Sequence, residues 1–139
     1  MSVTRTILTA AAFATTLGTS ALAQMVDATT IRPILEATKG NWIGVRNWEG
    51  QDLLYFTHLE SWKCGLSAIR YGINSAEATE VYEFELCADD EAAPSRIATD
   101  KLPYLVFEEN SIEMVTITLV YDDGAEQTES FERASVQIP

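Results

Sequence analysis

The sequence has few of the residues that catalysis and metal binding most often use. Its 139 residues include one histidine, His58, and two cysteines, Cys64 and Cys87. A single histidine excludes most zinc sites, and any Ser-His-Asp arrangement would have to use His58. We therefore expect no metal, no cofactor and no catalytic residue. A small hydrolase that uses His58 with a nearby carboxylate is kept as an alternative hypothesis.

Positive charge is scarce as well. Nine Lys and Arg residues stand against 21 Asp and Glu residues, which gives a formal net charge of −12. Contacts with phosphate groups require clusters of Lys and Arg, so this composition argues against nucleic acid and anionic lipid as partners. The short acidic runs at 89–91, 108–109 and 122–123 lack the alternating ligand spacing of an EF-hand loop, and we predict no calcium site there.

Long apolar runs are missing, and the most apolar segment is the N-terminal one. Arg5 precedes a mostly apolar run at 6–20, and small residues follow at Ala21 and Ala23. This order is typical of a secretory signal peptide, whereas the five threonines in the run are too polar for a membrane anchor. We predict cleavage after residue 23, export to the periplasm or beyond, and a single mature domain at 24–139 with no integral membrane segment.

The mature part reads as a small β domain. A short helix is expected between Asp27 and Gly40, because a capping residue precedes the apolar stripe and a glycine follows it. After Gly40 the apolar residues alternate with period two, with turn residues between the runs. We predict a mainly β fold, a small antiparallel sandwich of about seven strands with a short N-terminal helix. The expected strands are 42–48, 52–58, 65–73, 79–86, 104–107, 112–121 and 127–136.

The two cysteines fit one hairpin. Opposed residues in a hairpin have a constant sum of residue numbers, and Cys64 and Cys87 place the centre of the hairpin between Ser75 and Ala76. The turn predicted from composition has the same centre, and the same register opposes Ile69 to Tyr82. A shift of one residue would place apolar side chains opposite polar ones, so the register is well specified. We predict a structural disulfide between Cys64 and Cys87, as expected in an oxidising compartment.

One strand suggests a binding surface. Trp42, Arg46 and Trp48 alternate onto one face of the first expected strand, together with Gly44. Aromatic faces beside an arginine suit contacts with sugars or peptides. The alternative is that the N-terminal helix covers this face and makes both tryptophans part of the core.

The segments 30–42, 50–72 and 120–124, which include the Trp-Lys-Cys64-Gly stretch, resemble a group of small exported bacterial proteins. This group is proteobacterial in character and known only as hypothetical proteins without an attached activity. The resemblance implies an exported bacterial domain and transfers no site.

We expect a non-catalytic domain that binds a protein or cell-envelope partner. A second alternative is an accessory or inhibitor module that acts through its acidic connection 88–103.

Overall fold

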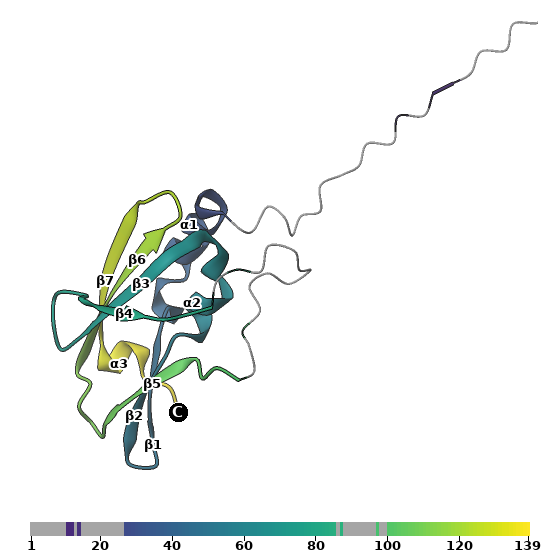
Figure 1. Ribbon diagram of the computed structural model, residues 1–139. Coiled ribbons are helices and arrows are strands. Elements are labelled where there is room, and N and C mark those ends of the chain that lie inside the picture. Colours follow the sequence, from purple (N-terminus) through teal and green to yellow (C-terminus); the bar gives the residue numbers. More distant parts are fainter. Residues whose placement is uncertain (1–10, 13, 15–26, 86, 88–96, 98–99) are drawn as a thin grey trace, which may run out of the picture.

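The predicted mainly β fold is confirmed in the computed structural model, which describes residues 11, 12, 14, 27–85, 87, 97 and 100–139. The described part contains seven strands in two antiparallel sheets, with one helix near its start (Figure 1). Residues 1–23, the predicted signal peptide, lie outside the described residues apart from 11, 12 and 14. The three-stranded sheet has the order β1 (Gly44–Trp48), β2 (Gln51–Tyr55), β5 (Tyr104–Glu108). The four-stranded sheet has the order β4 (Glu80–Tyr82), β3 (Leu66–Ile73), β6 (Met114–Tyr121), β7 (Glu126–Glu132).

Short helices interrupt the expected strands at several points. The N-terminal helix α1 (Ala28–Ala37) is capped by Asp27, whose carboxylate accepts a hydrogen bond from the Thr30 amide at 2.8 Å. Two predicted strands are too long, because residues near their ends form α2 (Thr57–Ser61) and α3 (Arg133–Val136) instead. Two 3₁₀ turns, η2 (Lys39–Asn41) and η3 (Lys63–Gly65), precede β1 and β3.

The core lies between the two sheets and α1. Ile31 and Leu35 of α1 are fully buried, and they join one hydrophobic cluster with Val45 and Leu54 of the three-stranded sheet. The four-stranded sheet adds the alternate residues of its central strands, among them Ile117. In Figure 1, α1 lies at one end of the molecule and the β1–β2 hairpin forms the opposite end. The hairpin therefore extends away from the helical end, and part of its sheet has no helix over it.

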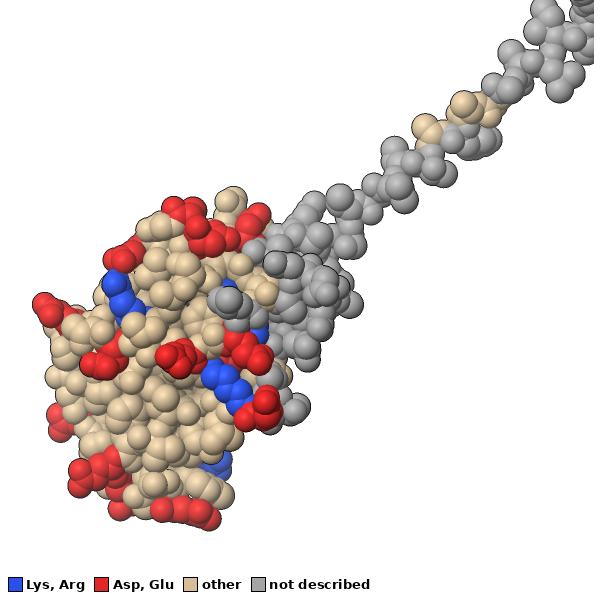
Figure 2. Space-filling view, in the orientation of Figure 1, with Lys and Arg blue, Asp and Glu red and all other residues tan. Residues whose placement is uncertain are grey.

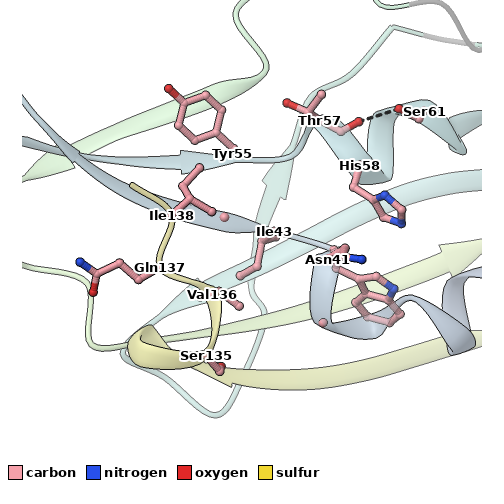
Figure 3. A pocket seen from close by; sticks show the side chains of 13 residues that line it. Asn41, Ile43, Tyr55, Thr57, His58, Ser61, Ser135, Val136, Gln137 and Ile138 are labelled. Atoms are coloured by element: carbon pink, nitrogen blue, oxygen red, sulfur yellow. Dashed lines mark hydrogen bonds between the residues drawn. The ribbon is translucent and has the colours of Figure 1, made fainter.

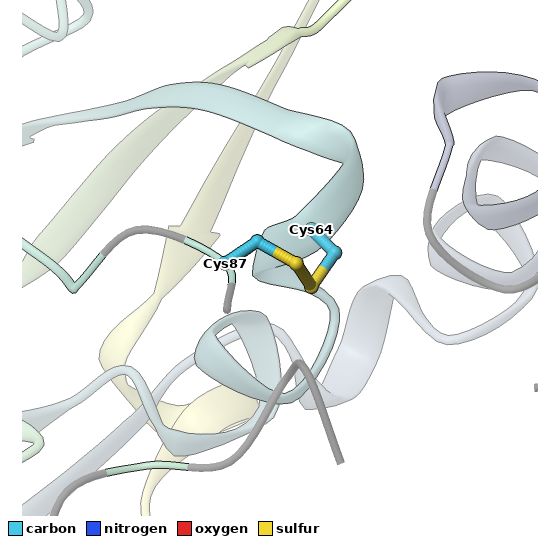
Figure 4. The surroundings of a disulfide bond; sticks show 2 residues. All are labelled: Cys64 and Cys87. Carbon is cyan, nitrogen blue, oxygen red and sulfur yellow. A yellow bond between two sulfur atoms is a disulfide. The ribbon is translucent and has the colours of Figure 1, made fainter. Parts of the chain in front are cut away.

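The disulfide between Cys64 and Cys87 is formed, with the two Cα atoms 4.9 Å apart (Figure 4). The hairpin register is also confirmed, because Ile69 pairs with Tyr82 and Arg70 with Val81. The paired part of β4 is short, so the disulfide closes the hairpin beyond the last ladder pair, where Cys64 lies in η3. The bond thus holds the start of β3 to residue 87.

Removal of this disulfide is expected to lower the free energy of unfolding by about 3 kcal/mol, because it releases a closed loop of the unfolded chain. The measurement is urea unfolding of the wild type and of Cys64→Ala/Cys87→Ala, each with and without reductant. Reductant should destabilise the wild type to the level of the double variant and leave the variant unchanged. Two free thiols in the native protein, detected by mass after alkylation, would contradict the assignment.

A buried ion pair joins the two sheets and was not anticipated from the sequence. The Arg133 guanidinium donates to both carboxylate oxygens of Asp52, at 2.6 and 2.9 Å. Asp52 is fully buried in β2 and also accepts a hydrogen bond from the Ile112 amide at 3.1 Å. The Arg133 guanidinium beside it, with backbone donors, holds the pKa of Asp52 at about 2. This pair fixes β2, the central strand of the three-stranded sheet, to the segments that enter β6 and leave β7.

Candidate functional site on the three-stranded sheet

The register of the three-stranded sheet defines which side chains share its outer face. Residues opposite one another across antiparallel strands point to the same side. The alternate residues Val45 and Leu54 belong to the core, so their neighbours along the strands face outward. The outer face comprises, in rows across the three strands, Gly44, Tyr55 and Tyr104; Arg46, Leu53 and Val106; and Trp48, Gln51 and Glu108.

Large apolar and aromatic side chains dominate this outer face. Trp48 is 48% exposed and Val106 is 50% exposed. The rings of Tyr55 and Tyr104 pack together, with centroids 5.0 Å apart. Leu53, between Arg46 and Val106 in the next row, is buried without being part of the main core cluster. Exposed apolar side chains that cluster in this way mark interaction surfaces more often than isolated ones do.

The C-terminal segment borders the same face. Ile138 is 41% exposed, and its side chain lies over Gly44, where an added Cβ would be 3.2 Å from its Cδ1 atom. Figure 3 shows Ile138 and Tyr55 on the same side of β1 and β2. The apolar surface therefore extends from the strands onto the last residues of the chain.

Arg46 supplies the one positive charge on this face. Its guanidinium stacks on the Trp48 ring, 4.1 Å from the ring centroid, in a cation–π contact. The other three arginines of the described part, Arg32, Arg70 and Arg133, each pair with a carboxylate. Among the described residues Arg46 has no ion pair, and its buried Nε atom has no hydrogen-bond partner. The half-buried Arg46 therefore places a positive charge without an ion-pair partner among the described residues on this face.

The outer face of the four-stranded sheet is built differently. Its hydroxyl groups pair with each other, Thr116 with Ser130 at 2.8 Å and Thr118 with Thr128 at 2.7 Å. Arg70 in the same face pairs with a carboxylate of β7, at 2.8 Å. The hydroxyl groups named here thus have partners within the chain, and the Arg70 charge is paired, although the buried Nε atom of Arg70 has no hydrogen-bond partner, like that of Arg46. The contrast identifies the outer face of the three-stranded sheet as the stronger candidate for a binding surface.

The position of Trp42 corrects the predicted strip. Trp42 is fully buried, donates from Nε1 to the Leu35 carbonyl oxygen at 2.9 Å, and packs edge-on against Phe131. Its backbone is helical because it closes the η2 turn, so the two-residue alternation of β1 does not reach it. Of the three predicted residues, Arg46 and Trp48 lie together on the outer face. The alternative prediction was that α1 covers both tryptophans. Trp42 is covered by α1, whereas Trp48 is exposed.

His58 lies in α2 rather than at the end of a strand, beside a hollow of about 560 Å³. Figure 3 shows the polar residues around it, among them Asn41 and Ser61. The Thr38 hydroxyl donates to the Ile34 carbonyl oxygen at 2.7 Å, so it accepts from Nε2 of His58, which lies 3.0 Å away. This contact assigns the proton of the neutral ring to Nε2.

The surroundings of His58 do not assemble acid–base chemistry from the described residues. The residues that line the hollow include no carboxylate. Burial lowers the pKa of His58, and no neighbouring negative charge acts against that effect. A carboxylate that oriented the ring would raise this pKa. The hydrolase hypothesis therefore finds no partner for His58 in the described part of the chain.

The acidic connection 88–103 lies mostly outside the described residues, which resume at residue 100 after residue 97. Its C-terminal end is held by Lys101, whose ammonium group donates to Glu60 at 3.0 Å and to the Glu83 carbonyl oxygen at 2.5 Å. The Tyr82 hydroxyl also donates to Glu60, and burial together with this bond raises the pKa of Tyr82 above its usual value. These contacts fix the chain just before β5.

Other kinds of site are not indicated by the part of the chain that the structure describes. No group of three or more His, Cys, Asp and Glu side chains in it could hold a metal ion. None of its helices has the length and apolar character needed to cross a membrane. No family model, curated protein or solved structure matches the chain. The function is therefore inferred from the geometry of the outer face.

Proposed function

We propose that this chain is an exported, non-catalytic domain that binds a protein partner of the cell envelope through the outer face of its three-stranded sheet. The observation that carries the proposal is the cluster of exposed Trp48 and Val106 with half-buried Tyr55 and Tyr104 around Arg46, which has no ion pair among the described residues. Tryptophan, tyrosine and arginine are the residues that most often dominate the binding energy of protein interfaces.

Export is supported by two independent features of the chain. Residues 1–23 have the order of charged, apolar and small residues that signal peptidases require. The Cys64–Cys87 disulfide fits an oxidising compartment such as the periplasm. Expression of the full chain in a bacterial host should give a periplasmic product. Its intact mass should lack residues 1–23 and show a deficit of two hydrogens that reduction restores. A full-length product in the cytoplasm would contradict export.

The binding proposal is tested by comparative capture from envelope extract. Immobilised wild type is compared with Arg46→Ala/Trp48→Ala and with Val81→Ser, which changes an apolar residue that is 61% exposed on the four-stranded sheet. The partner should be retained by the wild type and by Val81→Ser. Its affinity for the Arg46→Ala/Trp48→Ala variant should fall by about tenfold or more, the effect of losing two interface anchors. Equal retention by the folded double variant would refute the role of this face.

A further inference from the structure

Each of the two sheets has two edge strands, and three of these four, β1, β4 and β7, are protected against pairing with a further strand. The edge of β1 is covered by the chain itself, since the Ile138 amide donates to the Val45 carbonyl oxygen at 2.9 Å. The edge strand β7 carries Glu126, Glu129 and Glu132, and β4 is only three residues long. Charges, short length and coverage are the usual means by which proteins prevent a sheet from adding another strand.

Among the described residues no segment pairs with the second edge of β5, and the only charge in this strand is its last residue, Glu108. Its sequence is Tyr-Leu-Val-Phe-Glu, with no proline or lysine and with four residues of high β propensity or apolar character. A strand of this composition with an open edge readily pairs with another extended chain.

The direction of the backbone groups in β5 follows from the hydrogen-bond alternation of the sheet. The Phe56 amide donates to the Pro103 carbonyl oxygen at 2.8 Å, so Phe56 and Pro103 form a hydrogen-bonded pair. Hydrogen-bonded and non-hydrogen-bonded pairs alternate along an antiparallel ladder, so Leu54 and Leu105 form the next hydrogen-bonded pair. The intervening residues Tyr104 and Val106 therefore direct their amide and carbonyl groups away from β2. Two donors and two acceptors on the open edge are in position for an added strand.

We infer that the β5 edge accepts an extended segment of the partner as an added strand, which would continue the three-stranded sheet. This inference rests on the proposed function, because Val106 belongs both to this edge and to the outer face. Alternate side chains of the added strand would lie beside Val106 and Tyr104 on that face. Backbone bonds give such strand addition its affinity, and the alternate side chains give it specificity.

Charge defines the chemistry of the added strand. Glu108 ends β5 and Glu109 follows it, and Figure 2 shows several acidic side chains, with a basic group beside them, on the visible face of the end that the β1–β2 hairpin forms. A second copy of the chain, with its own net charge of −12, would be repelled. The occupant is therefore a segment of another protein, with alternating apolar residues and a Lys or Arg at the end that lies beside Glu108 and Glu109.

The test uses a phage-displayed library of random ten-residue peptides and the mature, oxidised protein as bait. Selected peptides should alternate β-branched or aromatic residues with polar ones and should carry Lys or Arg toward one end. On binding of the synthetic peptides, the amide resonances of Tyr104 and Val106 should shift the most in NMR spectra. Acidic or non-alternating selected sequences, or shifts confined to other parts of the chain, would overturn the inference.

A proline substitution separates edge pairing from binding to the face alone. Val106→Pro removes an amide that does not pair with β2, so the sheet should still form, whereas peptide affinity should fall by at least about tenfold for the lost backbone bonds. Two variants are the matched controls: Val106→Ala removes the side chain from the face but keeps the amide, and Asn47→Pro removes an amide that also points away from β2, at the opposite edge of the sheet. Val106→Ala should bind more tightly than Val106→Pro, and Asn47→Pro should bind normally. If Val106→Pro fails to fold, Val106→Lys takes its place, since a lysine blocks an edge without changing the backbone.

The outcomes distinguish the inference from the proposed function. Loss of peptide binding in Val106→Pro with retention in Asn47→Pro supports strand addition. Normal binding in Val106→Pro combined with loss in Arg46→Ala/Trp48→Ala would overturn strand addition and leave the face as the binding surface. Normal peptide binding in Val106→Pro and in Arg46→Ala/Trp48→Ala would overturn both strand addition and the role of the outer face. Formation of a dimer by the free protein in analytical ultracentrifugation, with β5 amides protected in it, would identify a second copy as the occupant and contradict the inference.

Discussion

Asp52→Asn is expected to lower the free energy of unfolding by about 3 to 5 kcal/mol, the usual cost of breaking a buried ion pair by removing one partner. The fully buried carboxylate of Asp52 accepts two bonds from the Arg133 guanidinium, and the amide group of asparagine cannot accept both. Arg133 would keep its charge without an ionised partner, with only the Ile112 carbonyl oxygen and one amide oxygen left to accept its hydrogen bonds. Urea unfolding of the wild type and the variant, followed by circular dichroism, measures the loss.

The matched control is Asp123→Asn, which breaks the exposed ion pair between Asp123 and Arg32. Exposed pairs contribute less than about 1 kcal/mol, so this variant should unfold close to the wild type. A loss of less than about 1 kcal/mol in Asp52→Asn as well would contradict the structural role that we assign to the buried pair.

The Asp52–Arg133 pair also predicts a pH dependence. The pKa of Asp52 is about 2 in the folded protein and about 3.8 as the ordinary value, so the folded state favours the ionised form. The corresponding stabilisation of about 2 kcal/mol is fully present above pH 4 and is lost as the pH falls through 2. Unfolding measured between pH 5 and pH 2 should show a steeper loss of stability for the wild type than for Asp52→Asn. Parallel curves would contradict the assignment.

Trp42→Ala is expected to destabilise the domain by about 3 to 5 kcal/mol, the range for truncation of a large buried aromatic residue. The fully buried indole fills the space between α1 and Phe131, and its loss also leaves the Leu35 carbonyl oxygen without its donor. Thermal and urea unfolding measure the effect. A loss of this size is a large part of the stability of a domain of 116 residues, the length of 24–139.

Trp48→Ala is the informative comparison, because the two residues were predicted from the sequence to share one surface. Trp48 is 48% exposed and contacts Arg46, so its truncation should change stability by less than about 1 kcal/mol. The same variant should weaken partner binding. Equal destabilisation by both substitutions would mean that Trp48 also belongs to the core, and it would remove the main support for the outer face as a binding site.

The hairpin of β3 and β4 is a part of the fold that could be predicted from the sequence. Its register followed from the two cysteines and the turn between them, because side-chain alternation and a covalent bond specify the same pairing. The β1–β2 turn lies between the expected strands 42–48 and 52–58, where the glycine of Glu49-Gly50 favours a turn. Both residues have positive φ angles there, as in a type I′ hairpin turn. These features depend on residues close together in the chain.

The features that could not be predicted from the sequence depend mostly on contacts between residues that are far apart in the chain. Asp52 and Arg133 are 81 residues apart, and nothing in the local pattern indicates that they meet. Trp42 was assigned to the wrong face because a 3₁₀ turn ends its alternation, and the expected strand at 52–58 was too long because α2 starts at Thr57. The outer face required the order β1, β2, β5, which brings Tyr104 and Val106 beside a hairpin that is about 50 residues earlier in the sequence.

The turn that joins β3 to β4 limits how this sequence can diverge during evolution. A Cβ atom at Gly72 would lie 2.0 Å from the Glu77 carbonyl oxygen, whereas nothing lies within 4 Å of a Cβ at Gly40. Any descendant that keeps the hairpin must therefore keep glycine at position 72, but position 40 is free to vary. Alignments of distant relatives should show glycine 72 preserved together with Cys64 and Cys87, even where the surface residues have been replaced.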